Sequence, residues 1–137
     1  MVIWRSQNRP LGWGRFGVKE RFFPTASEKL SERININFNF MGDLSNKEII
    51  NYLEYSTIDL LINTSHSEGL PVSIMEAFSC GIPAVAPNIG GINEIIDKNC
   101  GYLLSNKPTV KEIIKILENF INLPIDKKNA LKNEALK

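Results

Sequence analysis

Short apolar runs alternate with amphipathic runs along the chain from about residue 31 onward. Some of the apolar runs have the length and β-branched composition of strands: residues 34–40, 58–63, 82–86 and, more weakly, 102–104. The segments with helical periodicity or composition are residues 46–55, 71–80, 92–96, 109–121 and 127–136. This repeated order of strand and helix predicts an α/β fold in which helices flank a parallel sheet.

Residues 1–30 differ from the rest of the chain, because Arg, Gly and aromatic side chains crowd them in neither a strand period nor a helix period. We therefore divide the chain into a poorly patterned segment, residues 1–30, and an α/β domain, residues 31–137. Truncation or a shifted reading frame is one explanation for the first segment. At 137 residues the chain has room for one domain but not for two large lobes.

Two glycine-containing loops follow predicted strands directly, one around Glu68 and one at residues 86–91. In open parallel sheets, ligands bind beyond the carboxyl ends of the strands. Both loops fall at that edge, so we expect them to be neighbours.

The stretch SEGLPVSIMEAFSC, residues 67–80, carries the most informative chemistry. Pro71 suits a first helical turn, where a missing N–H costs nothing, and the helix start then offers unpaired N–H groups to a phosphate. Glu76 lies about a turn and a half further on. Because its neighbours are apolar, we expect its carboxylate to emerge from a mostly buried helix and to need a partner. Carboxylates accept hydrogen bonds from hydroxyls, so the combination suits a nucleotide-sugar.

Composition excludes several other classes of protein. A formal net charge of +1 gives no reason to expect nucleic acid as a partner. No signal peptide or bilayer-spanning run stands out, so we expect a cytoplasmic location. Cys80 and Cys100 lack the spacing of a zinc site, and we interpret them as free thiols.

In residues 68–94 the chain resembles the donor-binding half of glycosyltransferase family 4, the retaining GT-B enzymes also called glycosyl transferases group 1. The resemblance extends more loosely over residues 36–121. The matching elements are Ser65, the SEGLP run, Glu76-Ala77, Gly81-Ile82-Pro83, Gly90-Gly91, Glu94 and Gly101. It implies a Rossmann-like parallel sheet flanked by helices, the C-terminal half of a GT-B fold, which binds a nucleotide-diphosphate sugar with no metal and no cofactor.

The resemblance also implies roles for the residues around the loop at Glu68. Glu68, the catalytic candidate, would contact hydroxyls of the transferred sugar. The backbone at Gly69, Leu70 and Pro71 would hold the sugar and the phosphate.

Further donor contacts are implied on either side of this loop. Glu76 would accept a hydrogen bond from the ribose. The turn at Gly90 and Gly91 would let the backbone close on the donor, and Gly42 would leave room for the nucleotide base.

Two parts of the family pattern are in doubt or missing. The family uses an Arg and a Lys near the start of this domain to neutralise the leaving diphosphate, and Arg15 and Lys19 are the only candidates. A competing alignment places Gly12-Trp13-Gly14 on the glycine turn after the family's second strand, and the cation pair is then absent. The N-terminal lobe, which in these enzymes binds the acceptor, is not in this chain.

Simpler interpretations apply to several of these residues. A Glu before a helix gains from the helix dipole without any ligand, so the role of Glu68 depends on the resemblance. Gly69, Gly90 and Gly91 could supply turns alone. His66, the single histidine, has no second base or nucleophile beside it, and we do not propose it as a catalyst. We expect Glu94 to order the turn at residues 90–93.

The sequence therefore predicts the donor domain of a hexosyltransferase-type glycosyltransferase that acts, with retention, on a glycan or lipid-linked acceptor. Polysaccharide biosynthesis, with peripheral attachment at the inner face of the membrane, is a setting compatible with this function. One alternative is a non-catalytic nucleotide-sugar-binding fragment or partner subunit that needs a separate acceptor-binding lobe. Another is a degraded or misframed fragment that binds no donor.

Overall fold

The computed structural model describes residues 44–65, 67, 69 and 71–137 in full, and the backbone of three strands at residues 2–4, 11–13 and 38–40. Several residues singled out above lie outside this described part of the chain: Gly14, Arg15, Lys19, Gly42, His66, Glu68 and Leu70. Predictions that depend on those residues stay predictions.

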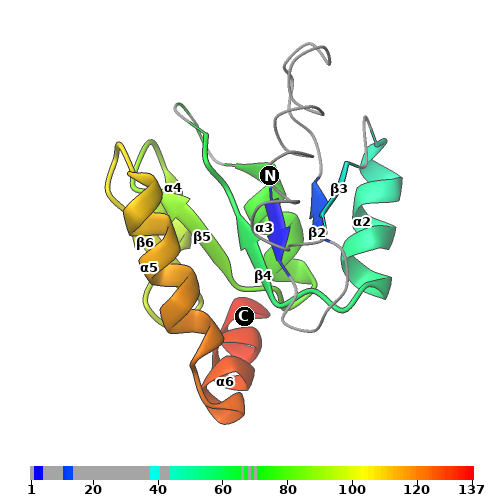
Figure 1. Ribbon diagram of the computed structural model, residues 1–137. Helices are drawn as coiled ribbons and strands as arrows, with labels where there is room; N and C mark the ends of the chain where they lie inside the picture. The colour runs from blue at the N-terminus through cyan, green and yellow to red at the C-terminus, as the bar shows by residue number, and fades with distance from the viewer. Residues whose placement is uncertain are drawn as a thin grey trace.

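The elements appear in the chain in the order that Figure 1 shows. The strands are β1 (Val2–Trp4), β2 (Leu11–Trp13), β3 (Phe38–Phe40), β4 (Leu60–Ile62), β5 (Ala84–Pro87) and β6 (Gly101–Leu104). The helices are α2 (Asn46–Tyr55), α3 (Val72–Ser79), α4 (Ile92–Ile95), α5 (Val110–Ile121) and α6 (Ile125–Ala135).

The described strands form one sheet in the order β3-β2-β1-β4-β5-β6. Strands β4, β5 and β6 are parallel, as predicted, and so are β2 and β3. Strand β1 is antiparallel to both β2 and β4, which the sequence pattern did not predict. Only residues 5–10 separate β1 from β2, and a parallel crossover needs a dozen or more residues, so an antiparallel pair is the arrangement that this connection permits.

The sheet also crosses the boundary that we drew between residues 30 and 31, because β1 and β2 lie before it. Each of these strands has only three residues. A run that short has too few positions to show a period of two, so the pattern of residues 1–30 did not reveal them.

Helices cover both faces of the parallel part of the sheet. Leu61 and Ala84 point to one face and join an apolar cluster with residues of α2, α3 and α4. Leu60 and Val85 point to the other face and pack with Phe120 of α5. Successive strand residues are therefore buried on alternate sides, which explains why these strands have continuous apolar sequences. The predicted Rossmann-like α/β architecture is confirmed.

Side-chain caps set the start of two helices. Ser45 caps α2: its hydroxyl accepts from the N–H of Glu48 at 3.4 Å, and its own N–H donates to the Glu48 carboxylate at 2.8 Å. The Ser45 hydroxyl also donates to the Glu48 carboxylate at 2.6 Å, and this bond, followed by the one from the Ser45 N–H, lowers the pKa of Glu48. Thr109 caps α5 by accepting from the N–H of Glu112 at 3.3 Å. The bounds predicted for α2 match the structure, and α5 begins one residue later than predicted because Thr109 is its cap.

Helix α6 begins directly after Pro124, two residues earlier than predicted, because the fixed φ of proline suits a helix start. Its residues Leu131 and Ala135 are buried, and Lys132 forms an ion pair with Asp59 at 3.3 Å. No helix in the described part of the chain has both the length and the apolar character that crossing a membrane requires.

Candidate functional site

The two loops predicted to be neighbours are in contact at the carboxyl edge of the sheet. The N–H of Gly91, in the loop after β5, donates to the carbonyl oxygen of Gly69, in the loop after β4, at 3.1 Å. This bond confirms that the glycine-containing loops converge. The parallel register of β4 and β5 brings both strands to the same edge and so produces this contact.

Asn63 orders the start of the loop after β4. It is the one buried polar residue among those the structure describes, with 3% of its surface exposed. Its side-chain Oδ1 accepts from the N–H of Ser65 at 2.8 Å, and its own N–H donates to the carbonyl of Val85 on β5 at 2.8 Å. The sequence analysis missed this role. An amide residue that closes an apolar strand run was the available signal.

A positive backbone φ and backbone hydrogen bonds determine the conformation of the loop after β5. Gly90 has a φ of 54°, a backbone conformation that residues other than glycine rarely adopt. The N–H of Ile92 donates to Ile89 at 3.2 Å, and that of Glu94 donates to Gly91 at 3.1 Å. The Glu94 side chain is exposed, and no described residue hydrogen-bonds to its carboxylate. Glu94 therefore contributes to this turn through its backbone N–H rather than through its side chain.

The N-terminus of α3 lies where the chain leaves the first of these loops, and no side chain caps it. Pro71 is the cap residue, and its carbonyl oxygen accepts from the N–H groups of Ile74 at 3.0 Å and Met75 at 3.4 Å. Within the described part of the chain, no acceptor binds the N–H groups of Val72 and Ser73. A helix start with unpaired donors and the positive end of its dipole suits an anion.

Glu76 occupies a more open position than the sequence predicted. We expected a mostly buried helix, but α3 buries only the face of Ile74 and Ala77. Val72 and Met75, which flank Glu76 on the opposite face, are 62% and 51% exposed. Glu76 is itself half-buried, and its carboxylate has no hydrogen bond or ion pair to any described residue. The carboxylate is therefore available to a ligand near the helix start.

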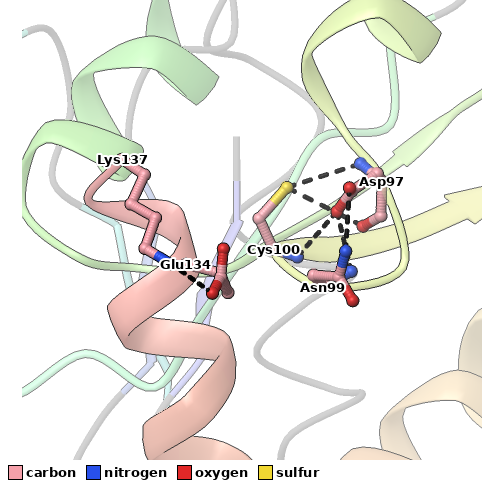
Figure 2. A network of polar contacts seen from close by, with 5 residues as sticks. All are labelled: Asp97, Asn99, Cys100, Glu134 and Lys137. Atoms are coloured by element: carbon pink, nitrogen blue, oxygen red, sulfur yellow. Dashed lines mark hydrogen bonds and ion pairs between the residues drawn. The ribbon is translucent and has the colours of Figure 1, made fainter.

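A second polar cluster lies at the opposite, amino edge of the sheet, in the turn before β6 (Figure 2). The Asp97 carboxylate accepts from the N–H groups of Asn99 at 2.7 Å and Cys100 at 3.2 Å. These bonds lower the pKa of Asp97, chiefly through the Asn99 backbone. Nearby on α6, Glu134 and Lys137 form an exposed ion pair at 2.6 Å.

The surroundings of Cys100 in this cluster favour the neutral thiol. Burial raises the pKa of its thiol, so the sulfur stays protonated at neutral pH. Both described cysteines, Cys80 and Cys100, are free, as predicted. The hydrogen bonds of Asp97 close a tight turn, and we interpret the cluster as structural.

Two open surface hollows occur in the described part of the chain, and neither is lined by Gly69, Glu76 or the start of α3. A cavity of about 190 Å³ adjoins the Asp97 cluster. A larger one, of about 390 Å³, lies at the carboxyl edge and is lined by Ile89, Asn106, Lys107 and Pro108. No cluster of three or more His, Cys, Asp or Glu side chains occurs among the described residues.

Comparison with known proteins identifies the family. The profile described as "Glycosyl transferases group 1" matches residues 16–137. The chain belongs to this family. The resemblance drawn from the SEGLP run, Glu76 and the paired glycines is thereby confirmed at the level of the family.

The group 1 chain is similar to several named glycosyltransferases. It is 32% identical to one subunit of human phosphatidylinositol N-acetylglucosaminyltransferase over 104 residues, which are 76% of the chain and 19% of that protein. It is 40% identical over 70 residues, 51% of the chain and 19% of the relative, to the O-antigen biosynthesis glycosyltransferase WbnH of Escherichia coli. The E. coli lipopolysaccharide glucosyltransferase WaaG is 27% identical over 72% of the chain and 25% of its own length.

Solved structures share the fold. HepE of Anabaena, in complex with UDP-glucose, superposes with a TM-score of 0.69 at 22% identity, over 90% of the chain and 33% of HepE. The C-terminal domain of the group 1 protein LpcC of Francisella tularensis superposes with a TM-score of 0.68 at 22% identity, over 83% of the chain and 58% of that domain. The group 1 chain thus spans about a fifth to a quarter of the length of the curated relatives given above.

Proposed function

We propose that the chain binds a nucleotide-diphosphate sugar where the loops after β4 and β5 meet. The observation that carries this proposal is the uncapped start of α3 beside the Gly69–Gly91 contact. Unpaired N–H groups, a contact between two glycines and a carboxylate with no partner among the described residues, that of Glu76, belong to these two loops and to α3. These groups suit a donor with a diphosphate and two sugar rings.

In the proposed complex, the backbone of Gly69 and Pro71 and the start of α3 hold the diphosphate, and Glu76 accepts from the ribose. The turn at Gly90 and Gly91 closes over the transferred sugar. Roles for Glu68 and Leu70 at the sugar and for Gly42 at the base remain those that the resemblance implies.

We further propose that this donor domain serves a retaining hexosyltransferase whose acceptor is a glycan or a lipid-linked glycan. The named functions of WbnH and WaaG, in O-antigen and lipopolysaccharide synthesis, support such an acceptor class. HepE in complex with UDP-glucose supports a UDP-sugar as one donor to test. The setting we propose is the cytoplasm, with attachment to the membrane through other parts of the enzyme or through its acceptor.

The chain alone is proposed to bind the donor with little or no transfer, since it spans about a fifth of its relatives and acceptor binding is assigned to a separate lobe. A partner protein that completes an active site together with such a lobe would have the same property. The test is to incubate the chain with labelled UDP-glucose and either water or a simple glycan, and to measure turnover. Robust turnover by the chain alone would contradict both possibilities and indicate a self-sufficient enzyme.

Donor binding is tested by calorimetry of the 137-residue chain with UDP-glucose, GDP-mannose, UDP and uridine, combined with amide NMR. We expect the diphosphates to bind and uridine to bind far more weakly, because uridine has no group for the start of α3. The signals of Gly69 and of residues 72, 73 and 91 should shift. If no diphosphate shifts them, the proposed function is wrong.

We also propose that donor binding requires no metal ion. The N–H groups at the start of α3 would supply the positive charge that a divalent cation supplies elsewhere. The affinity for UDP-glucose should therefore be the same in EDTA and in Mg²⁺. A loss of binding in EDTA would refute this part.

A further inference from the structure

The ladder of hydrogen bonds between β4 and β5 ends abruptly at the carboxyl edge of the sheet. The N–H of Asn63, the first residue after β4, still donates to the carbonyl oxygen of Val85 on β5 at 2.8 Å. A regular parallel ladder would continue two residues further on, from the N–H of Ser65 to the carbonyl oxygen of Pro87. That bond is not formed, because its donor and its acceptor are both used elsewhere.

The side chain of Asn63 takes the N–H that the ladder loses. Its Oδ1 accepts from the N–H of Ser65 at 2.8 Å. On the neighbouring strand, the carbonyl oxygen of Pro87 accepts from the N–H of Ile89 at 2.9 Å. Asparagine side chains compete with the hydrogen bonds of a sheet in this way. Without the Oδ1 acceptor, the pairing of β4 with β5 would be open to extend by two residues, about 6.6 Å.

Burial separates this role from direct contact with a ligand. Asn63 has 3% of its surface exposed, so its side chain does not reach a molecule bound at the surface. The strand before it is apolar and fully buried, and a polar side chain at its end costs free energy unless its atoms are hydrogen-bonded. The bond from the Ser65 N–H helps to offset that cost and fixes the point at which the chain leaves β4.

The point of departure matters because the two loops meet again further on. The loops after β4 and β5 separate at Ser65 and Pro87, and they rejoin where the N–H of Gly91 donates to the carbonyl oxygen of Gly69 at 3.1 Å. Pro71, two residues after Gly69, is buried and is the cap residue of α3. The route of the chain out of β4 therefore decides where the start of α3 lies at the edge of the sheet.

We propose that Asn63 is a positioning residue of the donor site: its Oδ1 ends the pairing of β4 with β5 and so sets the loop that carries the donor contacts. The inference rests on the proposed function. Asn63 does not touch the donor, and it acts through the N–H of Ser65 and the backbone that leads to Gly69. A loop that is already held in its binding conformation binds more tightly, because less ordering accompanies binding.

The experiment compares UDP binding, measured by calorimetry, among variants of the 137-residue chain. Asn63→Val removes the acceptor but keeps the backbone N–H that donates to Val85, so it should bind UDP about tenfold more weakly. Asn63→Thr has nearly the same shape as Asn63→Val but carries a hydroxyl that can accept the Ser65 N–H. It should recover the affinity to within about threefold of the unsubstituted chain. Asn63→Asp, which keeps an oxygen in place of Oδ1, should do the same.

Asn88 provides a matched control, because it follows β5 directly as Asn63 follows β4. Its N–H also donates to the next strand, to the carbonyl oxygen of Leu104 at 3.1 Å. Its side chain, however, is exposed and hydrogen-bonds to no described residue. Asn88→Val should therefore leave the UDP affinity within about twofold.

Amide hydrogen exchange gives a second measurement that needs no ligand. The Ser65 N–H should exchange slowly in the unsubstituted chain and in Asn63→Thr, and about tenfold faster in Asn63→Val. The NMR signal of Gly91 should also move in Asn63→Val, because its acceptor lies on the loop that Asn63 sets.

Two results would overturn the inference and leave the proposed function in place. One is equal UDP affinity in Asn63→Val and Asn63→Thr, with both variants shown to be folded by denaturation. The other is a loss of affinity that neither Asn63→Thr nor Asn63→Asp restores, because the acceptor would then not be its cause. If the unsubstituted chain binds no diphosphate, the proposed function fails, and the assignment of Asn63 to the donor site fails with it.

Discussion

Helices α3 and α5 both begin at the carboxyl edge of the sheet, after β4 and β6, but their first turns are completed in different ways. Thr109 caps α5, and Glu112 within its first turn binds back to Ser105. Helix α3 has neither a side-chain cap nor an acidic residue in its first turn. Among the described residues, a side chain thus caps the start of α5 and none caps the start of α3. This contrast separates a structural helix from one that we assign to ligand binding.

The largest expected effect is on the free energy of unfolding, and it compares the packing of α5 with that of α3. Phe120 of α5 is fully buried, in edge-to-face contact with Tyr102 and beneath Lys128, whereas Met75 of α3 is 51% exposed. Phe120→Ala should lower the free energy of unfolding by about 3–5 kcal/mol. Met75→Ala should change it by less than about 0.5 kcal/mol. Chemical denaturation measures both, and similar losses would mean that α3 is packed as tightly as α5.

The second effect concerns ligand binding at α3. Glu76→Ala should weaken UDP-glucose binding by about 1.5–3 kcal/mol, because a charge-assisted hydrogen bond to the ribose is lost, with little change in stability. Glu118→Ala, which removes an exposed glutamate of α5, is the control and should leave binding unchanged. Calorimetry gives both affinities. An unaltered affinity in Glu76→Ala would remove this residue from the site.

The third effect concerns the loop that contacts Gly69. Gly90 has a φ of 54°, so Gly90→Ala should cost about 1–2 kcal/mol of stability and should also weaken donor binding by displacing the neighbouring N–H of Gly91. Gly91→Ala is the matched control: its φ of −87° accepts a side chain, so its stability loss should be smaller. Equal losses in the two variants would mean that the turn conformation does not decide the effect.

The fourth effect isolates the cap of α5. Thr109→Ala should lower the free energy of unfolding by about 1 kcal/mol, because the N–H of Glu112 loses its acceptor. Donor affinity should not change, since α5 is not assigned to the donor. Denaturation and calorimetry of the same variant test this separation. A variant that kept its stability but bound donor poorly would reverse the roles of the two helices.

The smallest effect is a dependence of stability on pH. Hydrogen bonds from the N–H and the hydroxyl of Ser105 lower the pKa of Glu112 in the folded chain. A carboxylate with a lowered folded pKa stabilises the fold above its unfolded pKa, about 4.3, and this contribution disappears as the pH falls through the folded pKa. In Glu112→Gln the free energy of unfolding should therefore decrease less steeply as the pH falls. Denaturation at several pH values measures this slope. An unchanged slope would mean that Ser105 does not favour the charged form.

Much of the fold could be predicted from local signals. Ser45 and Glu48 mark the start of α2 because a capping box is a contact between residues three apart. The apolar runs that became β4 and β5 are buried on both faces, so their composition alone indicated a covered parallel sheet. Strands β1 and β2 were not predicted, because strands of three residues form through pairing with other strands and carry little local signal.

The candidate site was predictable in part. Pro71 and Glu76 were singled out from the residues themselves, and the glycines received donor roles from the family resemblance. The contact between the two loops followed from the parallel order. The exposure of α3 was predicted wrongly, because Val72 and Met75 are apolar and only the packing of neighbouring elements decides whether an apolar side chain is covered. The role of Asn63 had one local signal, an amide at the end of an apolar run, whereas the hollow at Lys107 had none, because its lining residues come together only in the fold.

The sequence by itself determined the alternation of strands and helices, the caps of α2 and α5 and the membership of the glycosyl transferases group 1 family, since these depend on residues near one another in the chain. The tertiary structure alone decided the antiparallel direction of β1, the bond between Gly91 and Gly69, the openness of α3 and the hollow at Lys107. Those features arise from contacts between segments far apart in the chain, and such contacts are set by how the whole sheet and its helices pack.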